Sequence, residues 1–144
     1  MPDCVLDASV VGLTNEQIPG PQAGEAFGRR LAVIKQVVSG ASRARYNPKL
    51  LGEYVRLARV RRNDVIELFF AVLDSGRAVF VKRNSLPRQH HATARGCGWP
   101  THDEHLLAAA LDGDRCCVFV TEEYLGRCGP RVYAVFGIRI EHLD

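Results

Sequence analysis

The chain has 144 residues, a formal net charge of +3, 47% hydrophobic residues and 24% charged residues, as soluble globular proteins do. Its length favours one domain over residues 1–144, with a core large enough to need no disulfide. No apolar run approaches the ~20 residues of a membrane-spanning helix, and the first residues lack the pattern of a signal peptide. These features predict a cytoplasmic protein that has no membrane partner.

The apolar periodicity alternates between strand and helix along the chain. Short apolar runs predict strands over residues 3–7, 43–46, 78–81, 116–120 and 138–140. Helical spacing predicts helices over residues 22–39, 48–58, 64–73, 101–111 and 131–136. Loops are expected over residues 14–22, 82–100 and 125–130, and residues 10–13 fit either strand or helix. This alternation favours an α/β fold, a three-layer α/β/α sandwich with a mainly parallel central sheet.

Polar residues mark where several helices should begin. Asn47 precedes a proline, which is the usual order of an N-cap and a first helical residue. Asp64 with Glu67, and Thr101 with Glu104, have the spacing of capping boxes. These signals predict helix starts at the three positions.

The five cysteines form no Cys-x-x-Cys pair. Cys4, Cys116 and Cys117 lie in apolar strand-like runs, which favours buried thiols over a redox pair. Cys97 and Cys128 fall in loop-like sequence, where a thiol can be exposed.

Acidic residues follow two of the most apolar strands. Asp7 ends the first strand, and Thr121, Glu122 and Glu123 follow the strand over residues 116–120. If these strands are neighbours in a parallel sheet, their carboxyl ends bring the acids together. That edge is where ligands of open α/β sheets bind.

Two further acids are expected near the same edge. Asp103 lies in the first turn of the helix that leads into one of these strands, and Glu53 lies near the front of a mid-chain helix. Clustered carboxylates repel one another, and hard divalent cations such as Mg²⁺ or Mn²⁺ are their usual partners. Such ions activate water for phosphodiester hydrolysis. The pattern also fits helix caps and turn residues of an ordinary α/β domain.

The basic residues are 16 arginines and 3 lysines. Arginine binds phosphate through paired hydrogen bonds and stacks on bases, although the base composition of the coding gene also enriches arginine. Three of the candidates are spaced three residues apart, as on one face of a helix. The candidate RNA-binding residues are Arg56, Arg59, Arg62, Arg83, Arg88 and Arg95.

A group of zinc-ligand types lies between residues 90 and 105. It consists of His90, His91, Cys97, His102 and His105. Their spacing matches no compact zinc finger, so solvated loop histidines are the favoured interpretation. The sequence also lacks the glycine-rich motifs of nucleotide-binding loops and the Gly-x-Ser-x-Gly motif of serine hydrolases.

Four short segments, in this order, resemble the PIN domain family, and the resemblance covers nearly the whole chain. They are Val5-Leu6-Asp7-Ala8-Ser9, Leu50-Leu51-Gly52-Glu53-Tyr54, Asp103-Glu104-His105-Leu106-Leu107-Ala108 and Val120-Thr121-Glu122-Glu123. The closing Gly137-Ile138-Arg139-Ile140 is also similar to the last strand of the family.

The resemblance implies a Mg²⁺- or Mn²⁺-dependent endoribonuclease that hydrolyses RNA with a metal-activated water. It implies that Asp7, Glu53, Asp103 and Glu123 are the metal-binding acids, that Glu122 can replace Glu123, and that Thr121 supports the fourth acid. The fourth acid is more often Asp in the family. RNA, a homodimer and, as for the toxins of the family, an antitoxin protein are the implied partners. The alternative is a PIN-like RNA- or protein-binding module with a weak or inactive site.

Overall fold

A five-stranded parallel sheet runs through the centre of the computed structural model, which describes residues 1–16, 24–59 and 61–144. The strand order is β3-β2-β1-β4-β5, and every pairing is parallel. The strands are β1 (Asp3–Leu6), β2 (Arg43–Tyr46), β3 (Val79–Phe80), β4 (Cys117–Val120) and β5 (Arg139–His142). The expected α/β class is confirmed.

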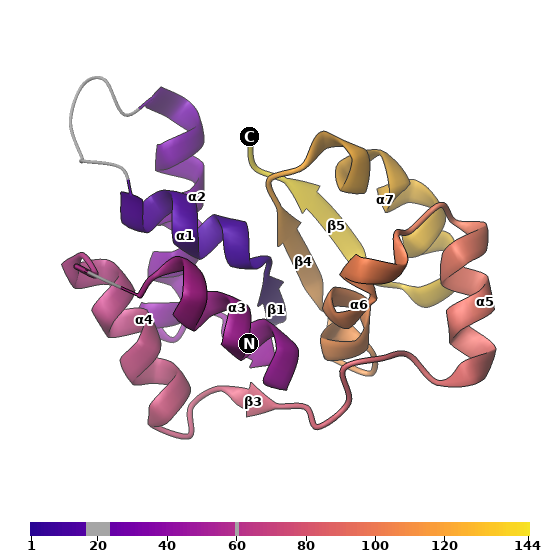
Figure 1. Ribbon diagram of the computed structural model, residues 1–144, viewed down its shortest axis with the longest axis horizontal. Helices are drawn as coiled ribbons and strands as arrows, with labels where there is room; N and C mark the ends of the chain where they lie inside the picture. The colour runs from indigo at the N-terminus through magenta and orange to yellow at the C-terminus, as the bar shows by residue number, and fades with distance from the viewer. Residues whose placement is uncertain (17–23, 60) are drawn as a thin grey trace.

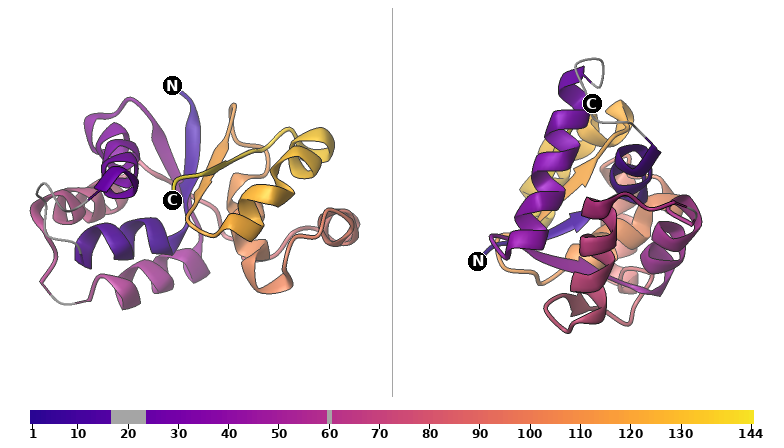
Figure 2. Two further views of the ribbon diagram at one scale, coloured as in Figure 1. Left: turned by 90° about the horizontal axis from the view of Figure 1, so that it is seen from above. Right: turned by 90° about the vertical axis from the view of Figure 1, so that its left-hand side faces the viewer.

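Helices cover both faces of this sheet (Figure 1; Figure 2, left). One layer contains α1 (Ala8–Glu16), α2 (Gly24–Ser39), α3 (Pro48–Leu57) and α4 (Asp64–Asp74). The other contains α5 (Arg88–Gly96), the 3₁₀ turn η1 (Thr101–Asp103), α6 (Glu104–Ala110) and α7 (Glu123–Phe136). The chain moves from β1 through β2 to β3 in one direction and from β4 to β5 in the other. Right-handed crossovers therefore place the connecting helices on opposite faces, which gives the expected α/β/α sandwich.

The two central strands lie in the core. Helices cover both faces of β1 and β4, so these strands have fully buried residues, namely Val5, Leu6, Val118 and Val120. This burial explains their continuous apolar runs.

In the described part of the chain, no helix is both long and apolar enough to cross a membrane.

All five cysteines are free and buried. The predicted burial of Cys4, Cys116 and Cys117 is confirmed, and burial raises the pKa of each of these thiols to about 12. Cys97 and Cys128 are buried as well, contrary to expectation. Helices α5 and α7 form where loops were expected, and these helices enclose both thiols.

The first helix begins earlier than its sequence indicates. Residues 10–13, which fitted either strand or helix, belong to α1. The expected loop over residues 14–22 is wrong for its first three residues, because α1 continues to Glu16. The remainder of that expected loop lies outside the described residues.

Two of the three predicted helix starts are confirmed, because α3 begins at Pro48 and α4 begins at Asp64. The Asn47 side chain accepts a hydrogen bond from a backbone N–H three residues on, at 3.0 Å. Asn63, not Asp64, caps α4 in the same way, at 2.9 Å. Thr101 opens a 3₁₀ turn, and α6 begins at Glu104 without a side-chain cap. Both predicted capping boxes are therefore wrong.

Two segments predicted as loops contain helices. Residues 82–100 include α5, and residues 125–130 lie inside α7. A Cβ atom at Gly126 would lie 2.9 Å from Cβ of His142, and one at Gly129 would approach β5 within 3.3 Å. These glycines therefore allow α7 to pack closely on β5, although glycine usually indicates a helix end.

A buried ion-pair network closes the amino end of the sheet. The Asp3 carboxylate accepts hydrogen bonds from Arg43 (2.9 Å), Arg45 (3.2 Å) and the backbone N–H of Asp114 (3.1 Å). Burial alone would raise the pKa of Asp3, but these hydrogen bonds and the two positive charges lower it. Arg45 also donates to two carbonyls at the end of α6, at 2.7 and 3.1 Å. The network thus joins β1, β2 and α6.

We expect Arg45→Met to lower the free energy of unfolding by about 3 kcal/mol, because removing one partner of a buried ion pair leaves the other charge poorly compensated. Urea unfolding measures this change. Arg139→Met is the matched control, since Arg139 and Glu141 form an exposed pair at 3.8 Å and exposed pairs contribute little. Equal losses in the two variants would contradict the structural role of Arg45.

Candidate functional site

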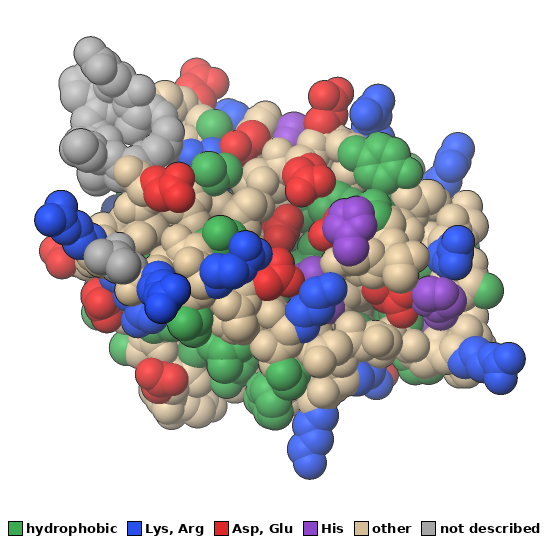
Figure 3. Space-filling view, in the orientation of Figure 1, with side chains coloured by type: hydrophobic (Ala, Val, Ile, Leu, Met, Phe, Trp, Pro, Cys, Tyr) green, Lys and Arg blue, Asp and Glu red, His purple; other side chains and the backbone are tan. Residues whose placement is uncertain are grey.

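Carboxylates from four separate elements meet at the carboxyl edge of the sheet. Asp7 follows β1, Glu53 lies on α3, Asp103 ends η1, and Glu122 precedes α7. β1 pairs with β4, so the condition under which the acids were expected to meet is fulfilled and the ends of these two strands lie side by side. Figure 3 shows acidic side chains near the middle of this face, with basic and histidine side chains around them.

These carboxylates are close enough to perturb one another. Burial raises the pKa of Asp7 to about 7, and the negative charges of Asp103, Glu122 and Glu53 contribute to the increase. Burial also raises the pKa of Glu53 and Asp103, while the positive charge of Lys49 opposes both increases. The site therefore holds more negative charge than its own basic groups neutralise.

Glu122 faces the other acids more directly than Glu123 does. The groups that raise the pKa of Asp7 and Asp103 include Glu122 and do not include Glu123. Both glutamates are exposed, and Glu123 is the first residue of α7. The structure thus groups Glu122 with Asp7, Glu53 and Asp103, although the resemblance places Glu123 at the fourth position.

His105 lies among the acids. Its Nε2 atom is 2.8 Å from Oε1 of Glu53, and its side chain is 2% exposed. Burial, with the positive charges of Lys49 and His102, lowers the pKa of His105 to about 4, so the ring is neutral at pH 7.

Several polar atoms of the site are buried without a hydrogen-bond partner among the described residues. They are both ring nitrogens of His105, Oε1 of Glu53 and Oδ2 of Asp103. The short contact between His105 and Glu53 lacks hydrogen-bond geometry. Oδ2 of Asp103 also lies 3.2 Å from Nε2 of His102. Because buried polar atoms without hydrogen bonds are costly, a ligand that bonded to these atoms would stabilise the site.

Two buried side chains hold α3 against the site. Asn47 donates from Nδ2 to the carbonyl of His105 at 2.9 Å. The Tyr54 hydroxyl donates to the carbonyl of Leu6 at 2.5 Å, one residue before Asp7. Burial raises the pKa of Tyr54 well above its usual value, so the hydroxyl remains a donor. In the sequence Asn47 is recognisable only as a cap, and no pattern there assigns a role to Tyr54.

Thr121 joins the end of β4 to the start of α1. Its hydroxyl lies 2.6 Å from the hydroxyl of Ser9, so the two share a hydrogen bond. Thr121 therefore fixes the backbone just before Glu122, which agrees with a supporting role. Ser9 was not predicted to be part of the site, although its position two residues after Asp7 places it at the same edge.

The predicted helical row of arginines is wrong, because α3 ends at Leu57. Arg56 is exposed on α3, whereas Arg59 and Arg62 lie beyond it. The Arg62 guanidinium stacks over the ring of Phe70 at 3.8 Å, and its Nε donates to a carbonyl near the end of α3 at 2.8 Å. Arg62 thus stabilises the connection between α3 and α4.

The other candidate arginines lie on the opposite layer. Arg83 donates to two carbonyls at the end of α6, both at 3.3 Å, and pairs with Asp112 at 3.4 Å. Arg88 and Arg95 are exposed at the two ends of α5. RNA binding by these residues remains a prediction.

The residues considered as zinc ligands are dispersed. His90 packs on Phe136 with ring centroids 5.6 Å apart, His91 contacts Glu104, and His105 lies among the acids. In residues 1–16, 24–59 and 61–144, no group of three or more His, Cys, Asp or Glu side chains is placed to hold a metal ion. The zinc interpretation therefore gains no support, and the four acids form an open arrangement.

The donors of the acidic site nevertheless suit a hard divalent cation. Carboxylate oxygens are the ligands that Mg²⁺ and Mn²⁺ prefer, and two of these oxygens are buried without hydrogen bonds. Comparisons of the chain with family models, with curated proteins and with solved structures find no match.

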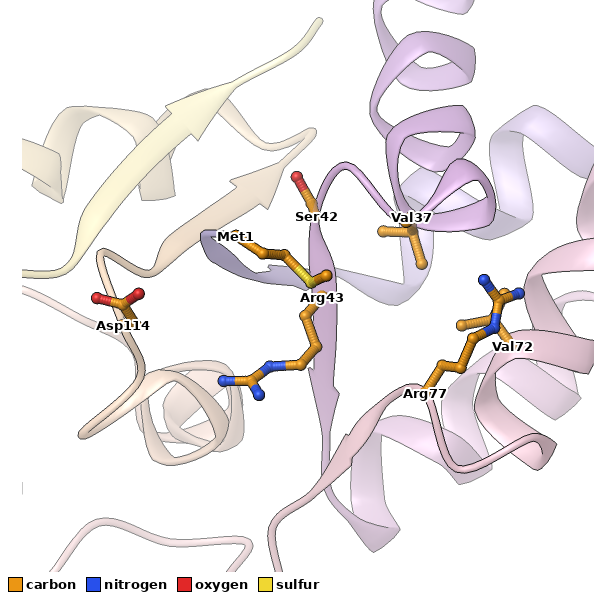
Figure 4. Close-up of a pocket in the computed structure, with 8 residues that line it drawn as sticks. Met1, Val37, Ser42, Arg43, Val72, Arg77 and Asp114 are labelled. Carbon is orange, nitrogen blue, oxygen red and sulfur yellow. The ribbon is translucent and has the colours of Figure 1, made fainter.

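A second cavity, of about 480 Å³, lies at the other end of the sheet (Figure 4). Met1, Ser42 and Asp114 line it, and each of these residues precedes a strand. The guanidinium of Arg43, which also lines this cavity, pairs with Asp3. The cavity is therefore separate from the acids, which follow the strands.

The raised pKa of Asp7 implies a pH-dependent cost of folding. In the unfolded chain an Asp titrates near 3.9, so between about pH 4 and 7 the folded state binds more protons and its stability falls as pH rises. His105 has the opposite effect, because its lowered pKa makes stability rise from about pH 4 to 6.5. The two contributions oppose each other in the wild-type protein.

We therefore expect the difference in free energy of unfolding between Asp7→Asn and wild type to increase from pH 4 to 7. The variant should gain about 2–4 kcal/mol relative to wild type over this window. Urea unfolding in EDTA at several pH values measures the difference. Glu123→Gln is the control and should follow wild type. A difference independent of pH would show that Asp7 ionises normally.

Proposed function

We propose that this chain is a PIN-like endoribonuclease in which Asp7, Glu53, Asp103 and Glu122 hold Mg²⁺ or Mn²⁺. The observation that carries the proposal is the convergence of these four carboxylates, which helps to raise the pKa of Asp7 to about 7. Such shifts are concentrated at functional sites, and a cation would offset the repulsion. The four PIN-like segments support RNA as the substrate.

Each part of the site has a task in this proposal. When bound, the cation lowers the pKa of a water molecule and stabilises negative charge on the phosphate. Asp7 and Asp103 provide buried anionic oxygens for it, and Asn47 and Tyr54 hold the surrounding backbone. Lys49 donates from Nζ to the carbonyl of His102 at 3.1 Å and opposes the pKa increases of Glu53 and Asp103, and in this proposal it contacts a phosphate at the site.

A binding module with a weak or inactive site is the second candidate. It is favoured by the open arrangement of the acids, since no group of three metal-ligand side chains is assembled in the described ranges. The contact between Glu53 and His105 also occupies one side of a carboxylate. Affinity for the cation separates the two candidates.

The remaining partners rest on the resemblance alone. Because the chain resembles PIN domains, we propose that it forms a homodimer, that an antitoxin protein can bind it and that it is located in the cytoplasm. The arginines that remain exposed, Arg56, Arg59, Arg88 and Arg95, are proposed to contact the RNA backbone.

We expect Mn²⁺ or Mg²⁺ to bind the wild-type protein and to raise its melting temperature. A ligand at 100 times its dissociation constant adds about 2.7 kcal/mol of stability. Calorimetric titration should show that Asp7→Asn abolishes binding and that Glu122→Gln weakens it roughly 10- to 100-fold. Glu123→Gln is the matched control and should bind as wild type does. No binding to wild type would favour the binding module, and a stronger effect of Glu123→Gln would restore Glu123 as the fourth acid.

We also expect cation-dependent cleavage of single-stranded RNA, and a fall of about 100-fold in the cleavage rate for Asp103→Asn, because loss of a cation ligand weakens both binding and activity. A fluorescently quenched RNA oligonucleotide measures the rate. EDTA should stop the reaction, and excess Mn²⁺ should restore it. Cleavage that persists in EDTA would contradict the proposal.

A further inference from the structure

A polar pocket of about 390 Å³ adjoins the acidic site. Its lining includes Lys49, Ser85, Arg88, His91, Glu104 and His105. His105 belongs to both places, because its Nε2 atom lies 2.8 Å from Oε1 of Glu53. The volume falls within the roughly 300–1,000 Å³ of small-molecule sites. A ligand in this pocket would therefore lie close to Glu53 of the acidic site.

The pocket offers positive charge from two exposed side chains, Lys49 and Arg88. Arg88 forms no ion pair with a carboxylate within the described residues, whereas Lys49 donates from Nζ to the carbonyl of His102 at 3.1 Å and partly offsets the charge of Glu53 and Asp103. The one acid in the lining, Glu104, is already bound: Oε1 accepts from the backbone N–H of Leu86 at 2.9 Å, and Oε2 lies 2.5 Å from Nδ1 of His91. The carboxylate of Glu104 thus holds the backbone of Leu86 and the ring of His91 in the pocket wall. The side chains that remain for a ligand, Lys49 and Arg88, favour an anion.

Two further features point to a ligand. His105 lines the pocket, and neither of its buried ring nitrogens makes a hydrogen bond among the described residues, although Nε2 has the 2.8 Å contact with Glu53. Helix α5 begins at Arg88, and its N-cap, Pro87, provides no side-chain hydrogen bond. Because Arg88 lines the pocket, the amino end of α5 lies at it, and the positive end of a helix dipole favours an anion.

The ring of His91 is held in one orientation by its contact with Glu104. Its Nδ1 atom engages the buried carboxylate of Glu104, so Nε2 is the nitrogen that remains for a ligand. An imidazole fixed in this way presents its second nitrogen without a further loss of side-chain freedom.

We propose that this pocket binds one nucleotide unit of the substrate strand, with Lys49 and Arg88 on its phosphate and His91 and Ser85 close to the ribose hydroxyls. The assignment of a nucleotide rests on the proposed ribonuclease function. The volume of the pocket is larger than a bare phosphate needs, and its polar lining suits a ribose. The pocket would hold the strand next to the scissile phosphate, and its binding requires no divalent cation.

The test is a calorimetric titration of the full chain in EDTA with adenosine 5′-monophosphate, adenosine and inorganic phosphate. We expect the monophosphate to bind most tightly, and Lys49→Ala and Arg88→Ala each to weaken it about tenfold, as the loss of one charged hydrogen bond does. Both side chains are exposed, so the variants should fold. Arg131→Ala, which removes an exposed arginine from α7, is the matched control and should bind as wild type does.

The other outcomes overturn the proposal. Equal affinity for adenosine and its monophosphate would show that the positive groups do not bind the phosphate. Equal affinity for inorganic phosphate and the monophosphate would reduce the pocket to a phosphate site. Unchanged binding in both Lys49→Ala and Arg88→Ala would place the nucleotide elsewhere. Because no cation is present, these results are independent of whether the acids bind Mg²⁺ or Mn²⁺.

Discussion

The crowding of carboxylates at the carboxyl edge of the sheet is the constraint on which the site depends. Mutual repulsion and burial disfavour the charged forms of these acids, so other contacts must keep the acids together. These contacts spare the carboxylate oxygens: the Tyr54 hydroxyl binds the carbonyl of Leu6, Asn47 binds the carbonyl of His105, and Ser9 binds Thr121. The backbone around each acid is fixed, and the acids remain available to a ligand.

Asp3 and Asp7 are buried carboxylates at the two ends of β1, and their surroundings differ in charge. Two arginines and a backbone N–H surround Asp3 at the amino end, and its pKa is lowered. Asp7, four residues later, is surrounded by other acids, and its pKa is raised to about 7. The negative charge of Asp3 is compensated by its arginine partners, and the resulting contacts join two strands and a helix. This arrangement indicates a structural role for Asp3. Missing compensation indicates a functional role, since only an external cation or proton can supply the charge.

Features that depend on burial, such as the central strands, could be predicted from the sequence. Features that depend on individual side-chain contacts, such as helix caps, were predicted poorly. The central strands were predictable because both of their faces are covered, and the meeting of Asp7 with the acids after β4 follows from parallel pairing. The capping box at Glu104 failed because that side chain binds Leu86 and His91 instead. The role of Arg62 was hidden for a similar reason, since its stacking on Phe70 joins residues that only the tertiary structure brings together. Whether Glu122 or Glu123 faces the site depends on one residue at a strand–helix junction, which periodicity does not resolve.

The acidic site and the basic pocket together resolve a difficulty that either would face alone. Four carboxylates repel a phosphodiester, so the proposed ribonuclease function requires positive groups beside them as well as a cation among them. Lys49 lies at this boundary, since it lines the pocket and offsets the charge of Glu53 and Asp103. His105 lies there too, and burial keeps it neutral. A charged imidazole at this position would pair with Glu53 and compete with a cation, whereas a neutral ring leaves the carboxylate free to bind one.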